Sequence, residues 1–130
     1  MKLNPDCIRD ILITVEANTD FNHIYTYLAS ELPNEHYLSK YSNDEVIYHI
    51  SQCDKSNLIE NVNYFDAGDM ITISDLSPEG QEFLNNIRED TNWHKTKEVA
   101  GKIGSFSLNM LSQIATNIVT SLINTHTGLT

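Results

Sequence analysis

Two side chains of the kind that bind metal ions lie one helical turn apart near the middle of the chain. His49 and Cys53 are four residues apart, a spacing that places both on the same face of a helix. A closed zinc site takes four ligands, however, and the other four histidines show no ligand spacing. Cys53 also falls on the apolar face of that helix, where a free cysteine is usually a packing residue. We therefore expect Cys53 in the core, and we predict no metal site and no cofactor.

The acidic side chains form no recognisable catalytic pair. A carboxylate serves as a general acid or base only where burial or a neighbouring charge shifts its pKa. Several acids, such as Asp44 and Glu45, instead follow a predicted helix start, where the helix dipole stabilises negative charge. The run Asp66–Asp69 lacks the alternating oxygen ligands of a calcium loop and predicts a tight turn. Because no nucleophile motif or phosphate-binding glycine loop is present, we predict that the protein is not an enzyme and has no catalytic residues.

The composition is that of a soluble globular protein of about one domain. The chain has 130 residues, of which 40% are hydrophobic and 20% charged. No stretch approaches the roughly 18 consecutive apolar residues of a membrane-spanning helix, and the first residues do not resemble a secretory signal. Two cysteines are too few for a disulfide framework and are typical of a reducing compartment. We expect no membrane span and a cytoplasmic location.

Local signals in the first half of the chain predict two helices separated by a short strand. Apolar residues at i, i+3, i+4 and i+7 predict a helix over 5–16, with Asn4 as its N-cap. Alternating β-formers predict a strand over 23–28, and a proline predicts a loop at 32–35. A second helix is expected to begin at 42–45, which have the Ser-x-x-Glu spacing of a capping box, and to end near 54–57.

The second helix is followed by a predicted antiparallel hairpin. Its strands, over 58–65 and 70–76, flank the aspartate-rich turn, and the second strand alternates apolar and polar residues as a half-buried strand does. The Ser-Pro pair at 77–78 predicts the start of a third helix. Gly80 falls in the first turn of that helix, where a residue without a side chain permits close approach to the hairpin.

The end of the chain is predicted to be helical and holds no charged residue after Lys102. A helix is expected from residue 91 to the glycines at 101 and 104, followed by a long amphipathic helix within 103–130. Three roles are open for this last helix: packing on the rest of the chain, contact with a second copy or another protein, or binding at a membrane surface. The candidate self-association residues lie on its apolar face. They are Leu108, Leu111, Ile114, Ile118, Val119 and Leu122.

The order helix, strand, helix, hairpin, helix is that of a winged-helix domain, in which the helix before the hairpin is the recognition element. A closer resemblance to one family rests on four segments, namely Pro5–Leu12, Tyr48–Ile50, Leu76–Gly80 and Phe83–Trp93. They are similar to domain-of-unknown-function family 2513, a family of phage, prophage and bacterial proteins. The resemblance implies an α+β, winged-helix-like domain over 1–90, a helical extension over 91–130, and a bacterial host cell. It implies no catalytic residues.

The charge pattern argues against DNA as the partner of that fold. The net charge is -10, and affinity for DNA depends on lysine and arginine side chains that neutralise phosphates. The turn of the hairpin carries two aspartates, and the outward face of the recognition helix has no lysine or arginine. The candidate partner-binding residues on that face are Asn43, Asp44, Tyr48, His49 and Gln52. If nucleic acid binds, the candidate contacts are Arg88, Lys95, Lys97 and Lys102.

These observations predict a non-enzymatic interaction module from a phage or prophage setting. It would act by protein–protein contact, as a homodimer or by binding a host protein, through the outward face of 43–53 and the uncharged tail. A dimeric winged-helix DNA-binding transcriptional regulator is the alternative. The two differ in salt dependence, because phosphate contacts weaken steeply as the salt concentration rises.

Overall fold

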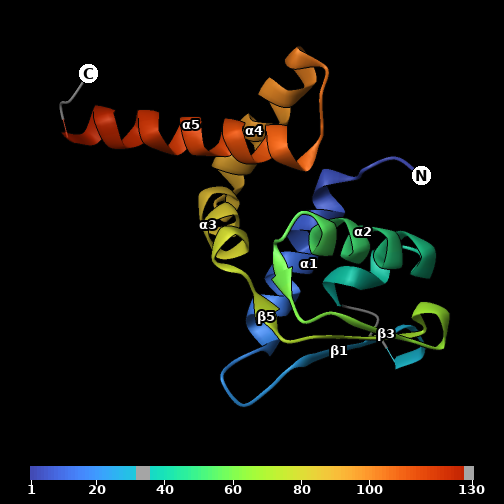
Figure 1. The fold of residues 1–130 in the computed structure, drawn as a ribbon. Coiled ribbons are helices and arrows are strands. Elements are labelled where there is room, and N and C mark those ends of the chain that lie inside the picture. Colours follow the sequence, from blue (N-terminus) through green and yellow to red (C-terminus); the bar gives the residue numbers. More distant parts are fainter. Residues whose placement is uncertain (32–35, 128–130) are drawn as a thin grey trace. The chain divides into compact units, whose positions relative to one another are not determined.

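The computed structural model describes residues 1–31 and 36–127, so the loop predicted at 32–35 lies outside the described residues. The chain forms two compact units, Met1–Gln81 (unit 1) and Glu82–Thr130 (unit 2) (Figure 1). This division falls inside a helix, so the domain boundary after residue 90 stays a prediction. The α+β class is confirmed, with helices in both units and antiparallel strands in unit 1.

Two capped helices form one layer of unit 1. Helix α1 (Pro5–Asn18) begins at its predicted N-cap, because the Asn4 side chain accepts the N–H of Asp6 at 3.1 Å. Helix α2 (Asn43–Lys55) begins with the predicted capping box, in which Ser42 and Glu45 each accept the backbone N–H of the other. The helices pack against each other on the same face of the sheet (Figure 1). Both predicted helix starts are confirmed.

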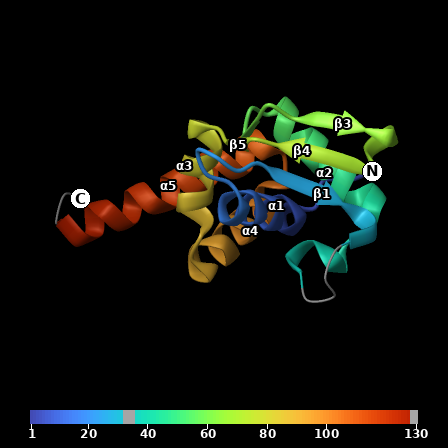
Figure 2. The ribbon, with the colours of Figure 1, turned by 90° about the horizontal axis from the view of Figure 1, so that it is seen from below.

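A three-stranded antiparallel sheet forms the other layer of unit 1. Its order is β1 (Tyr25–Leu28), β4 (Met70–Ile73), β3 (Asn63–Phe65), and Figure 2 shows the strands side by side in that order. A separate pair, β2 (Ile59–Glu60) with β5 (Asp75–Leu76), continues the same hairpin. The predicted hairpin is therefore confirmed, but each of its strands is divided in two.

The division of the hairpin has a local cause. Asn61 has a φ of 50°, in the left-handed region, which no residue of a regular strand adopts. The pairing still keeps one register on both sides of the break, with Glu60 opposite Asp75 and Asn63 opposite Thr72. The tight turn is confirmed as the short 3-10 segment η3 (Asp66–Gly68), where consecutive positive φ angles reverse the chain.

The start of helix α3 (Pro78–Ile87) is fastened to the first strand of the hairpin. The Ser77 hydroxyl accepts the N–H of Gly80 at 2.9 Å and donates to the carbonyl of Asn57. A Cβ on Gly80 would lie 1.9 Å from the carbonyl oxygen of Leu58, which is far inside van der Waals contact. The predicted close approach at Gly80 is confirmed.

Unit 2 contains a hairpin of two helices. Helix α4 (Asp90–Ile103) ends at Gly104, whose φ of 84° lets its N–H bond the carbonyl of Ala100 at 2.8 Å. Helix α5 (Leu108–Thr127) begins after a four-residue connection and packs against α4. It is six residues longer than α4, and Figure 1 shows its far half extending past that helix.

Candidate functional site

Four of the five predicted partner-binding residues on α2 lie at the surface. Asp44 is exposed, while Asn43, Tyr48 and Gln52 are half-buried. The Asn43 side chain is already engaged, because its oxygen accepts the hydroxyl of Tyr27 on β1 at 2.7 Å. This surface contains polar and acidic groups and therefore favours a polar or basic partner over a phosphate backbone.

The predicted outward position of His49 is wrong, because its side chain is only 1% exposed. Its Nε2 accepts the backbone N–H of Asn4 at 2.7 Å, and its Nδ1 lies 2.7 Å from the carbonyl oxygen of Glu45, to which it donates. His49 lies three residues after Val46 and four before Cys53, so it belongs to the buried face of α2. The imidazole therefore ties the start of α1 to α2 and is not available to a partner.

Both cysteines are buried free thiols, which confirms Cys53 as a core residue. Burial, reinforced by the nearby carboxylates of Glu45 and Asp10, raises the pKa of Cys7 to about 12. Burial also raises the pKa of Cys53. Since the thiolate is the nucleophile and the metal ligand, these thiols are unsuited to either role at neutral pH. Within the described ranges, no three histidine, cysteine or acidic side chains gather as metal ligands would.

A polar cavity of about 440 Å³ lies beside α1, and the sequence did not predict it. One of its lining residues, Asp10, is only 7% exposed, accepts the Tyr41 hydroxyl at 2.6 Å and pairs with the Lys40 ammonium at 3.0 Å. The remaining lining residues are Asn4, Asp6, Arg9 and Glu45. The available signal was a carboxylate within the apolar stripe of α1, between Cys7 and Ile11.

The contacts of Asp10 indicate a structural tie. Burial first, and then the hydrogen bond to Asp10, raises the pKa of Tyr41, so its hydroxyl keeps the proton that it donates. Lys40 and Tyr41 lie in and just after the 3-10 segment η2 (Tyr37–Lys40), so the contacts join that segment to α1. We find no unsatisfied buried side-chain atom among the described residues.

The predicted nucleic-acid contacts on α4 do not all lie on one side of the helix. The full predicted set is Arg88, Lys95, Lys97 and Lys102. On α4, Lys97 lies over the ring of Trp93, 5.4 Å from its centroid, and Lys102 pairs with Glu98 at 3.3 Å. Lys95 instead lines an apolar groove. Since Lys95 and Lys97 are two residues apart on a helix, they point to different sides.

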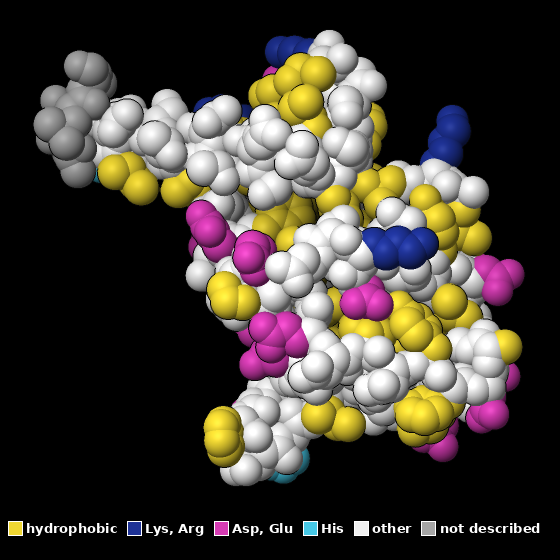
Figure 3. All heavy atoms as spheres, in the orientation of Figure 1, with side chains coloured by type: hydrophobic (Ala, Val, Ile, Leu, Met, Phe, Trp, Pro, Cys, Tyr) yellow, Lys and Arg dark blue, Asp and Glu magenta, His cyan; other side chains and the backbone are white. Residues whose placement is uncertain are grey.

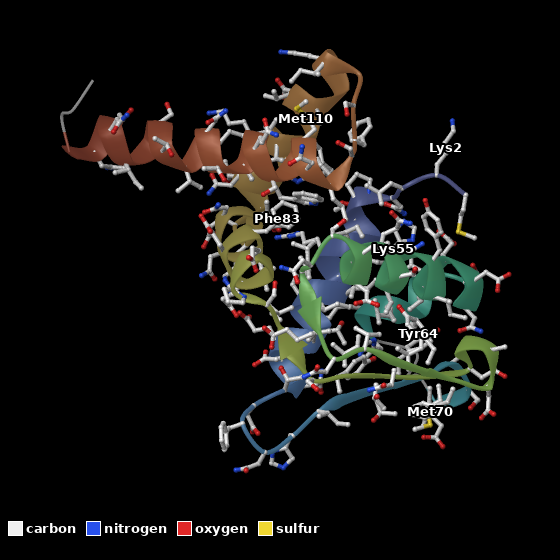
Figure 4. The ribbon with its side chains drawn as sticks, viewed as in Figure 1. Lys2, Lys55, Tyr64, Met70, Phe83 and Met110 are labelled. Carbon is white, nitrogen blue, oxygen red and sulfur yellow. The ribbon has the colours of Figure 1, made fainter. Side chains whose placement is uncertain are left out.

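That groove lies between α4 and α5 and has a volume of about 450 Å³. Along α5 its apolar wall is a row with four-residue spacing, namely Met110, Ile114, Ile118 and Leu122 (Met110 is labelled in Figure 4). Its rim on α5 is polar but uncharged and consists of Gln113, Asn117 and Ser121. From α4 come Lys95, Val99 and Ile103. We call this feature the α4–α5 groove.

The predicted self-association residues divide between the interior and the surface. Self-association requires side chains that a second copy can reach, but Leu108 and Leu111 are only 9% and 0% exposed. The prediction is therefore wrong for these two residues. The physical reason is that tertiary packing covers these side chains at the start of α5. Ile118 and Val119 are half-buried, and Leu122 is 39% exposed. Ile114 is 6% exposed but still lines the groove.

Charged side chains are distributed unequally between the two units. Residues 1–81 hold fourteen acidic and four basic side chains, whereas residues 82–130 hold four of each. The full net charge of -10 therefore belongs to unit 1. Within unit 2 no aspartate, glutamate, lysine or arginine follows Lys102, and on the face drawn in Figure 3 the far half of α5 bears none of these side chains.

Comparisons with known proteins agree with the resemblance noted from the sequence. The family model described as "Hypothetical protein (DUF2513)" matches residues 2–107, and the chain belongs to this family. An uncharacterized protein of Haemophilus influenzae is 30% identical over 125 residues, which is 95% of this chain and 99% of that protein. No solved structure matches the chain. Among the described residues, no helix has the length and apolar character needed to cross a membrane.

Proposed function

We propose that this member of the DUF2513 family is a non-enzymatic interaction module that binds protein through the α4–α5 groove. Its partner is a second copy of the chain or a protein of a bacterial host that a phage or prophage protein would meet. The observation that supports this function is the α4–α5 groove, whose wall on α5 is apolar and whose rim on α5 is uncharged.

The groove has the features of a helix-docking surface. Helices that dock in grooves insert apolar residues at one-turn intervals, and the row from Met110 to Leu122 offers a wall with that spacing. Leu122 and Ile123 are 39% and 55% exposed, although burying a leucine or isoleucine side chain contributes about 1.5–3 kcal/mol. A partner that covers the far half of α5 would gain this free energy.

The reactive groups of unit 1 support a binding role over catalysis. Cys7 and Cys53 are buried as protonated thiols, and the Asp10 carboxylate is held by Tyr41 and Lys40. Each group is explained by packing or by a structural tie. None of them needs a substrate to account for its position.

A DNA-binding regulator is the second candidate, and the arrangement of unit 1 favours it. Helix α2 is followed directly by an antiparallel hairpin whose inner strand β4 pairs with β1, as a winged helix requires. This function predicts DNA affinity that falls steeply with salt and is weakened by Lys95→Glu or Lys97→Glu. The interaction module predicts no salt-sensitive DNA binding, so an electrophoretic mobility assay distinguishes the two.

Photo-crosslinking in cells tests the proposed function. A photoreactive benzophenone amino acid replaces Ser121 at the rim of the groove, and in a matched control it replaces the neighbouring exposed Thr120, which does not line the groove. We expect an ultraviolet-dependent adduct with a protein from position 121 and a much weaker one from position 120. Equal labelling from both positions, or no protein adduct from position 121, would refute the proposed function.

A further inference from the structure

The geometry of unit 2 points to α5 of a second copy as the occupant of the α4–α5 groove. We propose that two chains form a symmetric dimer in which each α5 covers the groove of the other. This inference rests on the proposed function, because it names the partner of the same groove. Four properties of unit 2 support it: its charge, the composition of α5, the spacing of the groove wall, and the exposure at the end of α5.

Charge restricts how two copies can approach each other. Unit 1 carries the whole net charge of -10, so two copies repel each other when those units meet. Unit 2 has equal numbers of acidic and basic residues, and no charged side chain follows Lys102. A contact through unit 2 therefore brings together surfaces that carry no net charge. Lys95 is the one charged side chain in the groove lining, and its long stem can place the ammonium in water at the rim.

The composition of the groove calls for an uncharged occupant. A strongly basic or acidic helix would lose hydration there without gaining an opposite charge, apart from the single ammonium of Lys95. Helix α5 matches this requirement, because its 20 residues include no aspartate, glutamate, lysine or arginine. The chain thus supplies both the groove and a helix of suitable chemistry.

The spacing of the groove wall suits contact with a copy of itself. The wall repeats every four residues along α5, and rows of this spacing on two helices interdigitate in the commonest class of helix packing. In a two-fold interface each patch meets its own copy, so the polar rim also meets a polar rim. Gln113 and Asn117 each offer both a donor and an acceptor, which lets them hydrogen-bond to the same residues of the second copy.

The end of α5 keeps large apolar side chains exposed in a single chain. The last six residues of α5, 122–127, form about 9 Å of helix at 1.5 Å per residue. The apolar side chains on this part, Leu122 and Ile123, are 39% and 55% exposed, whereas Leu111 near the start of α5 is 0% exposed. A second α5 in the groove would cover Leu122, the exposed end of the groove wall.

Size-exclusion chromatography with light scattering tests the dimer, using the full chain over a range of concentrations. We expect a mass of twice 14.8 kDa for the wild type. Leu122→Glu should shift the mass to that of one chain, because each copy then places a carboxylate in the apolar contact. Thr120→Glu is the matched control. It lies two residues away, about 200° around the helix, and should remain dimeric.

Ser121→Glu repeats the test at an exposed rim position, and far-ultraviolet circular dichroism establishes that each variant keeps its helix. A folded Leu122→Glu or Ser121→Glu variant that stays fully dimeric overturns the inference. A wild type that has the mass of one chain at every concentration also overturns it. In that case, an adduct with a different protein from position 121 leaves the proposed function standing, and the absence of any adduct removes both.

Discussion

Replacing Gly80 with alanine tests the contact that joins α3 to the hairpin. On an exposed helix this change is expected to stabilise a protein, because alanine is favoured over glycine by about 0.8–1 kcal/mol. Here the new Cβ would lie 1.9 Å from the carbonyl oxygen and 2.8 Å from the carbonyl carbon of Leu58. Both neighbours are backbone atoms, so no side-chain rotation can relieve the clash. The intrinsic preference and the tertiary contact therefore predict opposite signs.

The magnitude follows from the movement that the clash requires. Ordinary contact begins at 3.4 Å, so the start of α3 and Leu58 must separate by well over 1 Å. That movement would break the bond from the Ser77 N–H to the Leu58 carbonyl, now 3.0 Å long. Overpacking costs about 1–3 kcal/mol and a lost hydrogen bond about 0.5–1.5 kcal/mol, against the smaller helix-propensity gain. We expect the free energy of unfolding to fall by about 2–3 kcal/mol, a large part of the roughly 5–15 kcal/mol typical of a domain.

Urea denaturation followed by circular dichroism measures this loss, with Gly101→Ala as the control. A Cβ on Gly101 would meet only the ring of Phe106 at 3.8 Å, which is ordinary contact. Gly101→Ala should therefore keep or raise the stability, by up to about 1 kcal/mol. If Gly80→Ala were as stable as the wild type, the close approach of α3 to the hairpin would not exist as described.

Three further predictions concern the buried polar groups of unit 1. His49→Ala should lower the free energy of unfolding by about 2–4 kcal/mol, because it leaves a cavity and removes the acceptor of the Asn4 backbone N–H; an unchanged urea midpoint would contradict the tie between α1 and α2. Tyr41→Phe removes a hydrogen bond to the Asp10 carboxylate and should cost about 1.5–3 kcal/mol in the same assay, whereas Tyr37→Phe, at a 55% exposed residue, should cost almost nothing. Stability should also fall at alkaline pH. The pKa of the Cys7 thiol is 9.0 in the unfolded chain and is raised to about 12 in the folded chain. Between these pH values the unfolded state binds fewer protons than the folded state, so the free energy of unfolding falls as the pH rises. A urea midpoint that stays constant as the pH rises above 9.0 would show that this thiol is not buried.

The predictions that succeeded depend on residues close together in the chain. Asn4 caps α1, and the pair Ser42 and Glu45 caps α2, because capping joins groups that are two or three residues apart. The hairpin follows from alternation and from the turn between its strands, which are also local. Gly80 is an informative exception. Its unfavourable place in a helix suggested a distant contact, and the structure identified that contact as Leu58.

The sequence by itself determined the helix starts, the hairpin, the α+β class and the absence of charge after Lys102. Only the tertiary structure decided that His49 is buried, since its partner Asn4 is 45 residues away in the chain. It likewise decided which part of the tail is covered. Leu111 and Leu122 have the same apolar character, yet one is 0% and the other 39% exposed. Burial depends on what a helix packs against, and the last turns of α5 keep Leu122 and Ile123 exposed.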